Sequence, residues 1–385
     1  MSKQLPRGWQ ELKLKDILHI SLKKYDPKKD ETNYRCIELE HIESNTGILK
    51  GYTNSTKQLS VKNMFQNGDI LYGKLRPYLK KFYNAKFDGV CSSEIWVLKG
   101  KNVINNFLYY FIQSSEFNYI ANVSYGTKMP RADWNYMAET TFLVPPLDEQ
   151  KRIAEILSTF DDLIENLNKL IEKKELYKKG VMQRVLSGKV RFNGFTDEWE
   201  EVYIKDVGTI ITGNTPSTKD KSFWGGKHVW VTPTDINKKD IDNSERKLTD
   251  IGLSKARKLP KNTLLVTCIA SIGKNSILRC EGSCNQQINA IIPNKNFSEE
   301  FLYYIFENNK KYLNAKAPAS ATKIISKTEF EKLSFILPKI DEQKKIAELL
   351  TLIDKDIDNL KQILHLRKLQ KKGVMQKLLT GEVRV

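Results

Sequence analysis

Residues 145–167, PPLDEQKRIAEILSTFDDLIENL, recur at residues 338–360 as PKIDEQKKIAELLTLIDKDIDNL. The match resumes downstream, where KKGVMQRVLSGKVR at residues 178–191 aligns with KKGVMQKLLTGEVR at residues 371–384. The offset between the copies is 193 residues throughout, with no insertion or deletion. A repeat that keeps its register over this length predicts a geometry that tolerates no inserted residue, and it divides the chain into two similar halves.

Both repeated segments are expected to be long helices with a hydrophobic seam, because apolar residues alternate in steps of four and three. The predicted helix-pair interface comprises Ile153, Leu157, Phe160, Ile164, Leu167 and Ile171 in the first copy and Ile346, Leu350, Ile353, Ile357, Leu360 and Leu364 in the second. Asp148 and Asp341 are predicted N-caps, and Gly180 and Gly373 mark predicted C-terminal caps or kinks. Each helix would then have about thirty residues and a length of roughly 45 Å. We expect the two copies to pair with each other as an antiparallel coiled coil; dimerisation of two molecules is the alternative.

The segments before the two helices are expected to be mixed α/β domains. Strand-like runs at residues 68–72 and 263–267 are bounded by Gly, Asn, Pro or Ser, and helical stretches around residues 107–117 and 301–312 follow. The predicted fold is therefore an α/β protein, with two mixed α/β domains separated by two long helices and with pseudo-twofold symmetry. The predicted boundaries are 1–144 for the first domain, 145–191 for the first helical region and spacer, 192–337 for the second domain and 338–385 for the second helical region.

The charge of the chain predicts a polyanionic partner. The formal net charge is +17 and the isoelectric point is near 9.4, and basic side chains that neutralise phosphates release condensed counterions. Nucleic acid is the favoured polyanion, and an anionic membrane surface is the alternative partner. The other alternative is that the basic surface is solvated and has no polyanionic partner. No apolar run approaches the roughly 18 residues of a membrane span, and the N-terminal residues lack the apolar region of a signal peptide. We expect a soluble, cytoplasmic protein.

Taken together, these motifs resemble the specificity subunits of type I restriction-modification enzymes, over essentially the whole chain. The residues that carry the resemblance are Pro-x-x-Asp-Glu-Gln-x-x-Ile-Ala from Pro145 and Pro338, Lys-Lys-Gly-Val-Met-Gln from Lys178 and Lys371, Arg191-Phe-x-Gly-Phe-Thr-Asp-Glu-Trp199, Gly213-Asn-Thr-Pro-Ser217 and Phe223-Trp-Gly-Gly226. The first domain departs from the last two motifs, since Ile20-Ser-Leu-Lys stands in place of a Gly-x-Thr-Pro-Ser stretch.

The resemblance implies a DNA-binding subunit without a catalytic centre of its own. Each target-recognition domain would read one half of a bipartite double-stranded DNA target, while the helices set the spacing and dock two modification subunits. The modification subunits would bind S-adenosylmethionine and flip an adenine for methylation, and motor-nuclease subunits would join them for cleavage. This chain would bind no cofactor and no metal.

Two other classes of protein remain as alternatives, a solitary DNA-modifying enzyme and a coiled-coil scaffold that does not bind DNA. A methyltransferase would need an Asn/Asp-Pro-Pro-Tyr-type loop and a motor would need GxxxxGK[ST], and the sequence has neither. Glu149-Gln-Lys151 and Glu342-Gln-Lys344 match the Glu-x-Lys half of a nuclease site, but acidic residues also suit the first turn of a helix. Binding of S-adenosylmethionine would favour the enzyme, and salt-dependent duplex binding would exclude the scaffold.

Base reading requires Arg or Lys for guanine and Asn or Gln for adenine. DNA-binding candidates in the first domain are Lys74, Arg76, Tyr78, Lys80, Lys81, Thr127, Lys128 and Arg131, and those in the second are Lys219, Lys221, Lys227, Lys274, Asn285, Gln286, Gln287, Thr322 and Lys323. For each residue alone, a solvated-surface or turn-forming role is the alternative. As a group they are predicted to include phosphate contacts.

Overall fold

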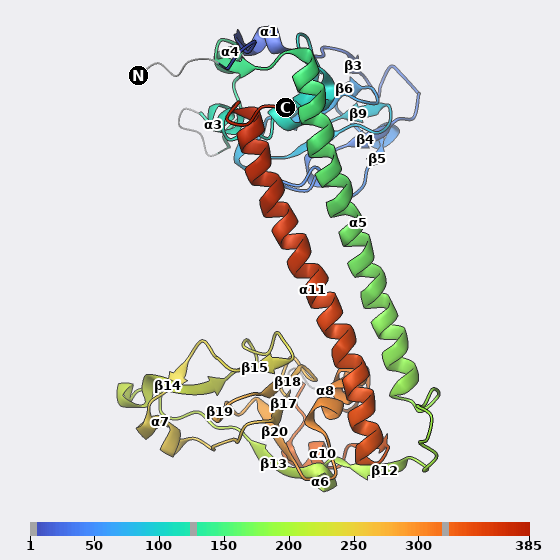
Figure 1. The fold of residues 1–385 in the computed structure, drawn as a ribbon, viewed down its shortest axis with the longest axis vertical. Coiled ribbons are helices and arrows are strands. Elements are labelled where there is room, and N and C mark those ends of the chain that lie inside the picture. Colours follow the sequence, from blue (N-terminus) through green and yellow to red (C-terminus); the bar gives the residue numbers. More distant parts are fainter. Residues whose placement is uncertain (1–5, 124–128, 318–322) are drawn as a thin grey trace. The chain divides into compact units, whose positions relative to one another are not determined.

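The computed structural model describes residues 6–123, 129–317 and 323–385. The chain forms two compact units, and Figure 1 shows its elements coloured along the sequence. Unit 1 combines Met1–Asn168 with Gln362–Val385, and unit 2 is the continuous stretch Lys169–Lys361. Each unit therefore contains one globular domain and a part of each long helix. Within the described residues, no helix has the length and apolar character needed to cross a membrane.

The two long helices are α5, Leu147–Val185, and α11, Ile340–Leu379, with 39 and 40 residues. At 1.5 Å per residue each is about 60 Å long, which exceeds the predicted length. The prediction of caps at Gly180 and Gly373 was wrong, because both glycines lie inside the helices. After each glycine the next turn packs on a domain core, through Val181 and Met182 in unit 2 and their repeat counterparts in unit 1, and this packing offsets the low helix propensity of glycine.

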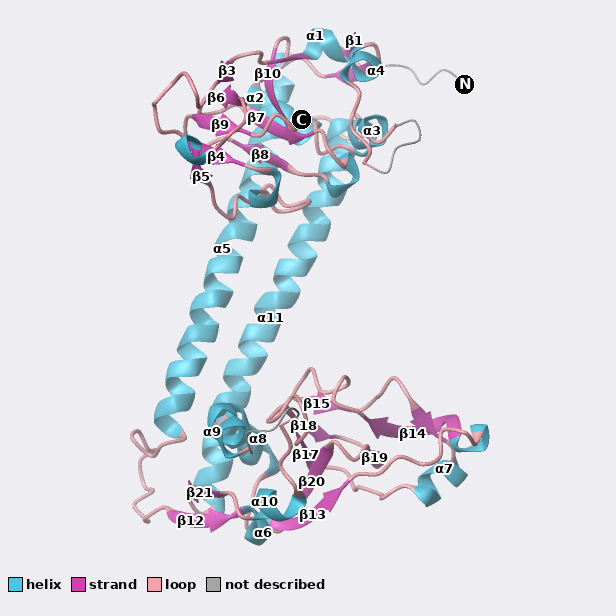
Figure 2. Ribbon diagram, turned by 180° about the vertical axis from the view of Figure 1, so that it is seen from behind, coloured by secondary structure: helices cyan, strands magenta, loops and turns pink. Residues whose placement is uncertain are grey.

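The helix starts also differ from the prediction. Asp148 and Asp341 are in the first turn of α5 and α11 and are not N-caps. The predicted antiparallel pairing is confirmed, because Lys174 pairs with Asp356 at 2.6 Å and Lys178, one turn later in α5, pairs with Asp354. Figure 2 shows the two helices side by side.

The domain of unit 1 contains a four-stranded and a five-stranded sheet. The four-stranded sheet has the order β2 (Leu18–Ile20), β10 (Ile95–Gly100), β7 (Ile70–Gly73), β8 (Phe82–Asn84), and the five-stranded sheet has the order β3 (Lys24–Tyr25), β6 (Lys62–Phe65), β9 (Gly89–Cys91), β4 (Arg35–Ile37), β5 (Thr53–Asn54). A further pair joins β1 (Gln10–Lys13) to β11 (Thr141–Val144), and the helices are α1 (Leu14–Ile17), α2 (Asn105–Phe111), α3 (Ser115–Ala121) and α4 (Trp134–Ala138).

The domain of unit 2 has one additional strand in the sheet that corresponds to the four-stranded one, and its other sheet has three strands instead of five. The sheet with the additional strand has the order β13 (Gly208–Thr212), β20 (Ile288–Pro293), β17 (Thr263–Thr267), β18 (Asn275–Leu278), β15 (Asp240–Ile241). The remaining strands form the sheet β16 (Lys247–Leu248), β14 (Trp224–Val231), β19 (Gly282–Cys284) and the pair β12 (Glu200–Tyr203), β21 (Ser334–Leu337). The helices are α6 (Ile204–Val207), α7 (Asp250–Lys255), α8 (Glu299–Asn308), α9 (Lys310–Lys316) and α10 (Lys327–Glu331).

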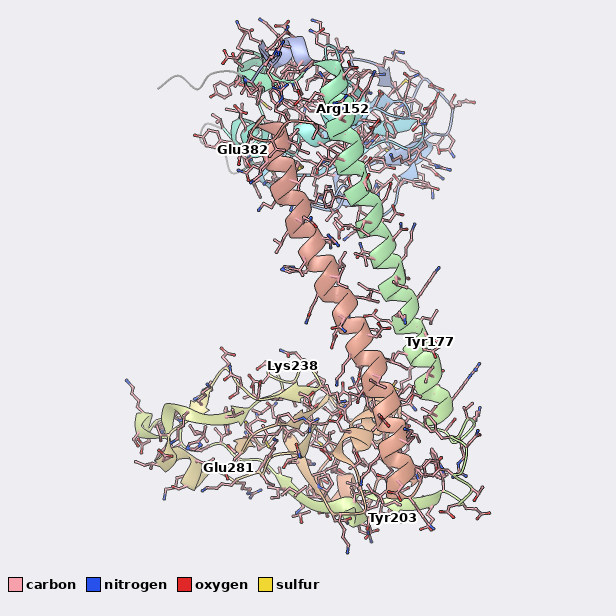
Figure 3. All side chains as sticks on the ribbon, in the orientation of Figure 1. Arg152, Tyr177, Tyr203, Lys238, Glu281 and Glu382 are labelled. Atoms are coloured by element: carbon pink, nitrogen blue, oxygen red, sulfur yellow. The ribbon has the colours of Figure 1, made fainter. Side chains whose placement is uncertain are left out.

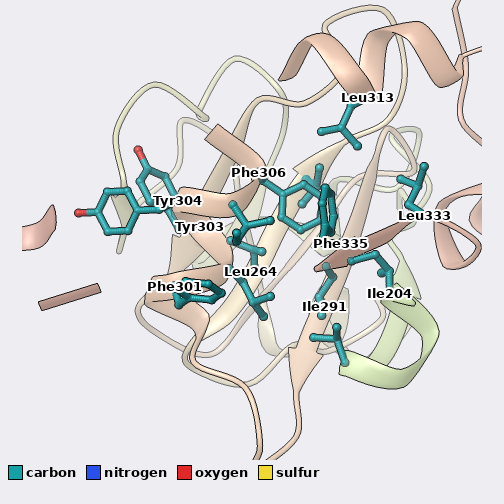
Figure 4. Packing of buried hydrophobic residues seen from close by; sticks show 14 of the residues in the cluster. Ile204, Leu264, Ile291, Phe301, Tyr303, Tyr304, Phe306, Leu313, Leu333 and Phe335 are labelled. Atoms are coloured by element: carbon teal, nitrogen blue, oxygen red, sulfur yellow. The ribbon is translucent and has the colours of Figure 1, made fainter. Parts of the chain in front are cut away.

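The helix ends belong to the domain cores. In unit 2, Ile346 and Leu350 of α11 lie in one cluster with Phe301 and Phe306 of α8, part of which is drawn in Figure 4. In unit 1, Ile153 and Leu157 of α5 occupy the same places in the other core. Of the other residues assigned to the helix seam, Ile171 and Ile357 are buried and Phe160, Ile164, Leu167, Ile353, Leu360 and Leu364 are half-buried. The heptad pattern therefore includes residues that hold the domains onto the helices.

Replacing Gly180 with alanine is expected to stabilise the protein by about 0.5–1 kcal/mol, because glycine has the lower helix propensity. A Cβ built at Gly180 meets no atom within 4 Å. The change can be measured as a rise in the midpoint of urea unfolding. Gly188, with φ of +69°, provides the matched control, because alanine is strained in that conformation and should lower the midpoint.

Candidate nucleic-acid interface

In unit 1 the loop after β7 is joined to two segments distant in the sequence. The backbone nitrogen of Lys74 donates to the carbonyl of Glu94 at 2.9 Å, and the nitrogen of Ala132 donates to the carbonyl of Lys74 at 2.8 Å. The nitrogen of Arg76 donates to the carbonyl of Pro130 at 2.8 Å. The structure thus brings together the two candidate DNA-binding loops of the first domain.

Unit 2 has the same junction after β17. The nitrogen of Cys268 donates to the carbonyl of Gln287 at 2.8 Å, and the nitrogen of Ile325 donates to the carbonyl of Cys268 at 2.9 Å. The nitrogen of Ala270 donates to the carbonyl of Lys323 at 3.1 Å. We call this common set of three hydrogen bonds the loop frame. It places the candidates of residues 285–287 beside Lys323.

The loop frame contains a left-handed residue at the same place in each domain. Arg76 has φ of 52° and Ala270 has φ of 60°, and each is the third residue after its strand. A left-handed conformation at a residue other than glycine costs about 1–3 kcal/mol and is typical of functional sites. In unit 1 the chain then forms a short 3₁₀ turn, Pro77–Leu79, and Lys80 is left-handed as well.

The candidate side chains of unit 1 fall into two groups. Arg76 and Tyr78 are exposed, and Lys74 and Lys80 are half-buried. The Lys81 ammonium instead donates to the carbonyl of Leu39 at 2.6 Å, and burial lowers its pKa. Lys81 is half-buried like Lys74 and Lys80, but its ammonium already has an internal partner.

Arg131, on the second loop of unit 1, is held by an acidic neighbour. Its guanidinium makes two hydrogen bonds to the Glu94 carboxylate, at 3.0 and 3.3 Å. Arg131 is exposed to solvent and Glu94 is half-buried. The corresponding positions of the loop frame in unit 2 are Ile324 and Gln287. The two frames thus present different chemistry at one place.

In unit 2 the three amides lie on the turn between β19 and β20. Asn285 is buried and donates its side-chain amide to the Gln287 amide oxygen at 2.9 Å. Exposed Gln286 accepts a hydrogen bond from the Thr215 hydroxyl at 2.6 Å.

All five basic candidates of this domain are exposed: Lys219, Lys221, Lys227, Lys274 and Lys323. The Lys227 ammonium lies 3.6 Å from a carboxylate oxygen of Asp250. Thr127, Lys128 and Thr322 lie outside the described residues.

Next to the loop frame of unit 2 is a hollow of about 540 Å³ that sequence analysis did not find. Its lining includes Ala270, Asn285, Trp230 and Arg246. The Arg246 guanidinium lies 3.8 Å from the ring centre of Trp224 and 5.3 Å from that of Trp230. A stacked guanidinium keeps its hydrogen-bond donors for a ligand. The sequence contains no signal for the stacking of Arg246 on Trp224 and Trp230, because these three residues meet only after the chain has folded.

The Glu-x-Lys segments have a structural role at the helix starts. Buried Glu342 accepts two hydrogen bonds from the Arg191 guanidinium, at 2.9 and 2.7 Å, and one from the Trp199 indole at 3.1 Å. In unit 1, Glu149 accepts the equivalent bonds from Arg384 and Trp9. We call each such trio a latch. Because these three bonds engage both carboxylate oxygens, the geometry supports a structural role and not the nuclease alternative.

Comparison with known proteins identifies the family. The family model described as the type I restriction modification DNA specificity domain matches residues 6–175 and 196–366. The chain belongs to this family. The MjaVIII specificity subunit of Methanocaldococcus jannaschii is 27% identical over an alignment of 418 positions, gaps included, which covers 99% of this chain and 94% of that protein.

Two solved structures share the fold over nearly the whole length of this chain. One, from work on complex assembly and conformational transition of the type I R-M system, has a TM-score of 0.66 at 18% identity and covers 99% of this chain and 100% of its own. The other, the S subunit of a type I system from M. genitalium, has a TM-score of 0.59 at 17% identity, with 98% of each chain covered.

Proposed function

We propose that each domain of this specificity subunit reads one half of a bipartite double-stranded DNA target through its loop frame. The observation that carries the proposal is that the two frames share a backbone and differ in side chains. Unit 1 presents Arg131 and Glu94 where unit 2 presents Ile324 and Gln287. Hydrogen-bonding groups of different kinds select different bases. Exposed cations around each frame, such as Arg76 and Lys274, would contact phosphates.

We further propose that the long helices dock two modification subunits and set the distance between the half-sites. Support comes from exposed apolar side chains on both helices. Leu170, Leu176 and Tyr177 of α5 are exposed, as are Leu366 and Leu369 of α11; Figure 3 labels Tyr177 on α5. Apolar side chains gathered on an exposed surface are typical of protein interfaces. Catalysis would be supplied by the partners, with S-adenosylmethionine on the modification subunits and cleavage by motor-nuclease subunits.

Exchange of one domain tests independent reading. Replacing residues 1–144 with the first domain of another family member should change one half of the methylated sequence and leave the other half as before. The measurement is methylation mapping of DNA from cells that express the exchanged chain with its modification subunits. The same chain without those subunits is the control and should give no methylation. A change in both halves of the target would contradict independent reading.

A further inference from the structure

In unit 2 a lysine side chain fills a socket between the domain and helix α11. The Lys239 ammonium lies 3.1 Å from the Tyr304 hydroxyl and 2.8 Å from the Thr351 hydroxyl, and it forms an ion pair with Glu300. It also lies 4.7 Å from the centre of the Tyr304 ring. Figure 4 shows the Tyr304 hydroxyl pointing out of the hydrophobic cluster, which leaves it available to the cation.

The lysine is brought to this socket by the additional strand of unit 2. Lys239 immediately precedes β15, which runs parallel to β18. The nitrogen of Ile277 donates to the carbonyl of Lys239, and that of Arg279 to the carbonyl of Ile241, both at 2.7 Å. The strand and the lysine are therefore one element: β15 extends the sheet and its flanking residue supplies the charge.

Unit 1 has a similar socket, and among its described residues no strand corresponds to β15. The counterparts of Tyr304, Thr351 and Glu300 are Tyr110, Ser158 and Asn106, by the repeated Phe-Leu-Tyr-Tyr motif and the 193-residue offset. The hydrogen-bond acceptors of the two tyrosines are equivalent as well. The Tyr110 hydroxyl donates to Asp161 at 2.8 Å, and the Tyr304 hydroxyl donates to Asp354 at 2.7 Å.

These three residues line a cavity of about 620 Å³ in unit 1. The carboxylates of Glu155 and Asp162 also line it, together with Lys86 and Lys151. Lys151 lies 3.7 Å from Asp148. The cavity thus keeps the two hydroxyl groups of the lysine socket, has the Asn106 amide where unit 2 has the Glu300 carboxylate, and carries acidic groups from α5, which complement a cation.

The strand next to this cavity pairs with a neighbour on one side only, as far as the described residues extend. Strand β8 is the last in its sheet, and its residues Tyr83 and Asn84 line the cavity. The backbone nitrogen of Ala85 donates to the carbonyl of Asp69, on the β7 side, at 2.9 Å. Because backbone N–H and C=O groups alternate between the two sides of a strand, those of Asn84 point away from β7. Asn84 pairs with Ile70 in unit 1 as Ile277 pairs with Leu264 in unit 2. Asn84 is therefore the counterpart of Ile277, the residue of β18 that bonds to Lys239 beside β15.

We propose that this edge and cavity of unit 1 bind an extended, lysine-bearing segment of a partner protein. The segment would add to β8 as a parallel strand, as β15 does to β18, and its ammonium would contact Tyr110, Ser158 and Asn106. Strand addition takes its affinity from backbone hydrogen bonds and its specificity from side-chain pockets. Unit 2 would not need such a partner, because it carries the segment in its own chain.

The full-length protein can be tested with a fluorescent peptide of residues 236–243, INKKDIDN, which is the chain's own β15 segment. Saturable binding is expected by fluorescence anisotropy. The control peptide has glutamine in place of Lys239 and keeps Lys238, whose position in the chain is labelled in Figure 3. It should bind about tenfold more weakly, because hydrogen bonds to a charged group are lost.

Two variants of the protein locate the site. Asn106→Glu reproduces Glu300 of unit 2 and should tighten binding of the lysine peptide about threefold to tenfold, but not that of the control peptide. Asn106 is exposed in the first turn of α2, where an acidic residue suits the helix. Asn84→Pro should abolish binding, because it removes the outward N–H of β8 that would bond to the added strand. The variant should still fold, since proline is tolerated at a sheet edge. Absence of saturable binding, equal affinity of the two peptides, or binding unaffected by both variants would overturn the proposal.

Discussion

Replacing Glu342 with alanine is expected to lower the free energy of unfolding of unit 2 by about 3 kcal/mol, because it removes the carboxylate of a latch. Glu342 is 2% exposed and receives three hydrogen bonds, from Arg191 and Trp199. Without it, the indole N–H and the guanidinium lose their common acceptor. The segment between α5 and the second domain would then separate from the start of α11.

The measurement is urea unfolding, with hydrogen exchange at residues 191–199 to localise the loss. Glu348→Ala is the matched control, since Glu348 is on the same helix and forms an exposed ion pair with Lys345. The Glu348 side chain is 60% exposed and that of Lys345 is 52% exposed. The control should change stability by less than about 0.5 kcal/mol. Equal effects of the two substitutions would show that the latch does not stabilise unit 2.

Lengthening the helix pair is expected to change the spacing of the DNA half-sites. Four residues would be inserted after Asn168 in α5 and four after Lys361 in α11, the two points where the helices pass from one unit to the other. Each insertion adds about 6 Å and rotates the remainder of its helix by roughly 40°. Since B-DNA rises about 3.4 Å per base pair, the unread spacer should grow by one or two base pairs, as seen in maps of methylated sites.

Insertion of two residues at the same points should instead abolish assembly. Two residues rotate the remainder of the helix by roughly 200°, which would turn Ile171 and the rest of the seam toward solvent. The expected result is loss of methylation and of complex formation with the modification subunits. An active four-residue variant with an unchanged spacer would show that the helices do not measure DNA.

The helices were predictable because their signal is local and repeated. A seam with alternating steps of four and three can be recognised without knowledge of the rest of the fold. The ends of the helices were not predictable in the same way. Gly180 weakens helix propensity, but the following turn is held by contacts with a core that the sequence cannot display. Tertiary packing overrode the local signal there.

The candidate interface was predictable in composition and not in arrangement. Residues 74–81 and 285–287 are recognisable as basic or amide-rich turns. That Lys74 bonds to Glu94 and Ala132 depends on strand order, which pairs segments distant in the sequence. Lys239 carried no signal at all, because a lysine between two polar residues looks the same whether it faces solvent or fills a socket.

The division of the chain has a consequence for folding during synthesis. Unit 2 is one continuous stretch, so it can fold as soon as residue 361 has left the ribosome. Unit 1 cannot complete its core until Leu378 has been made, nor close its latch until Arg384 has. The domain that is translated first therefore matures last. Until then its unfinished core exposes apolar surface, which is a risk for aggregation and a reason to engage chaperones.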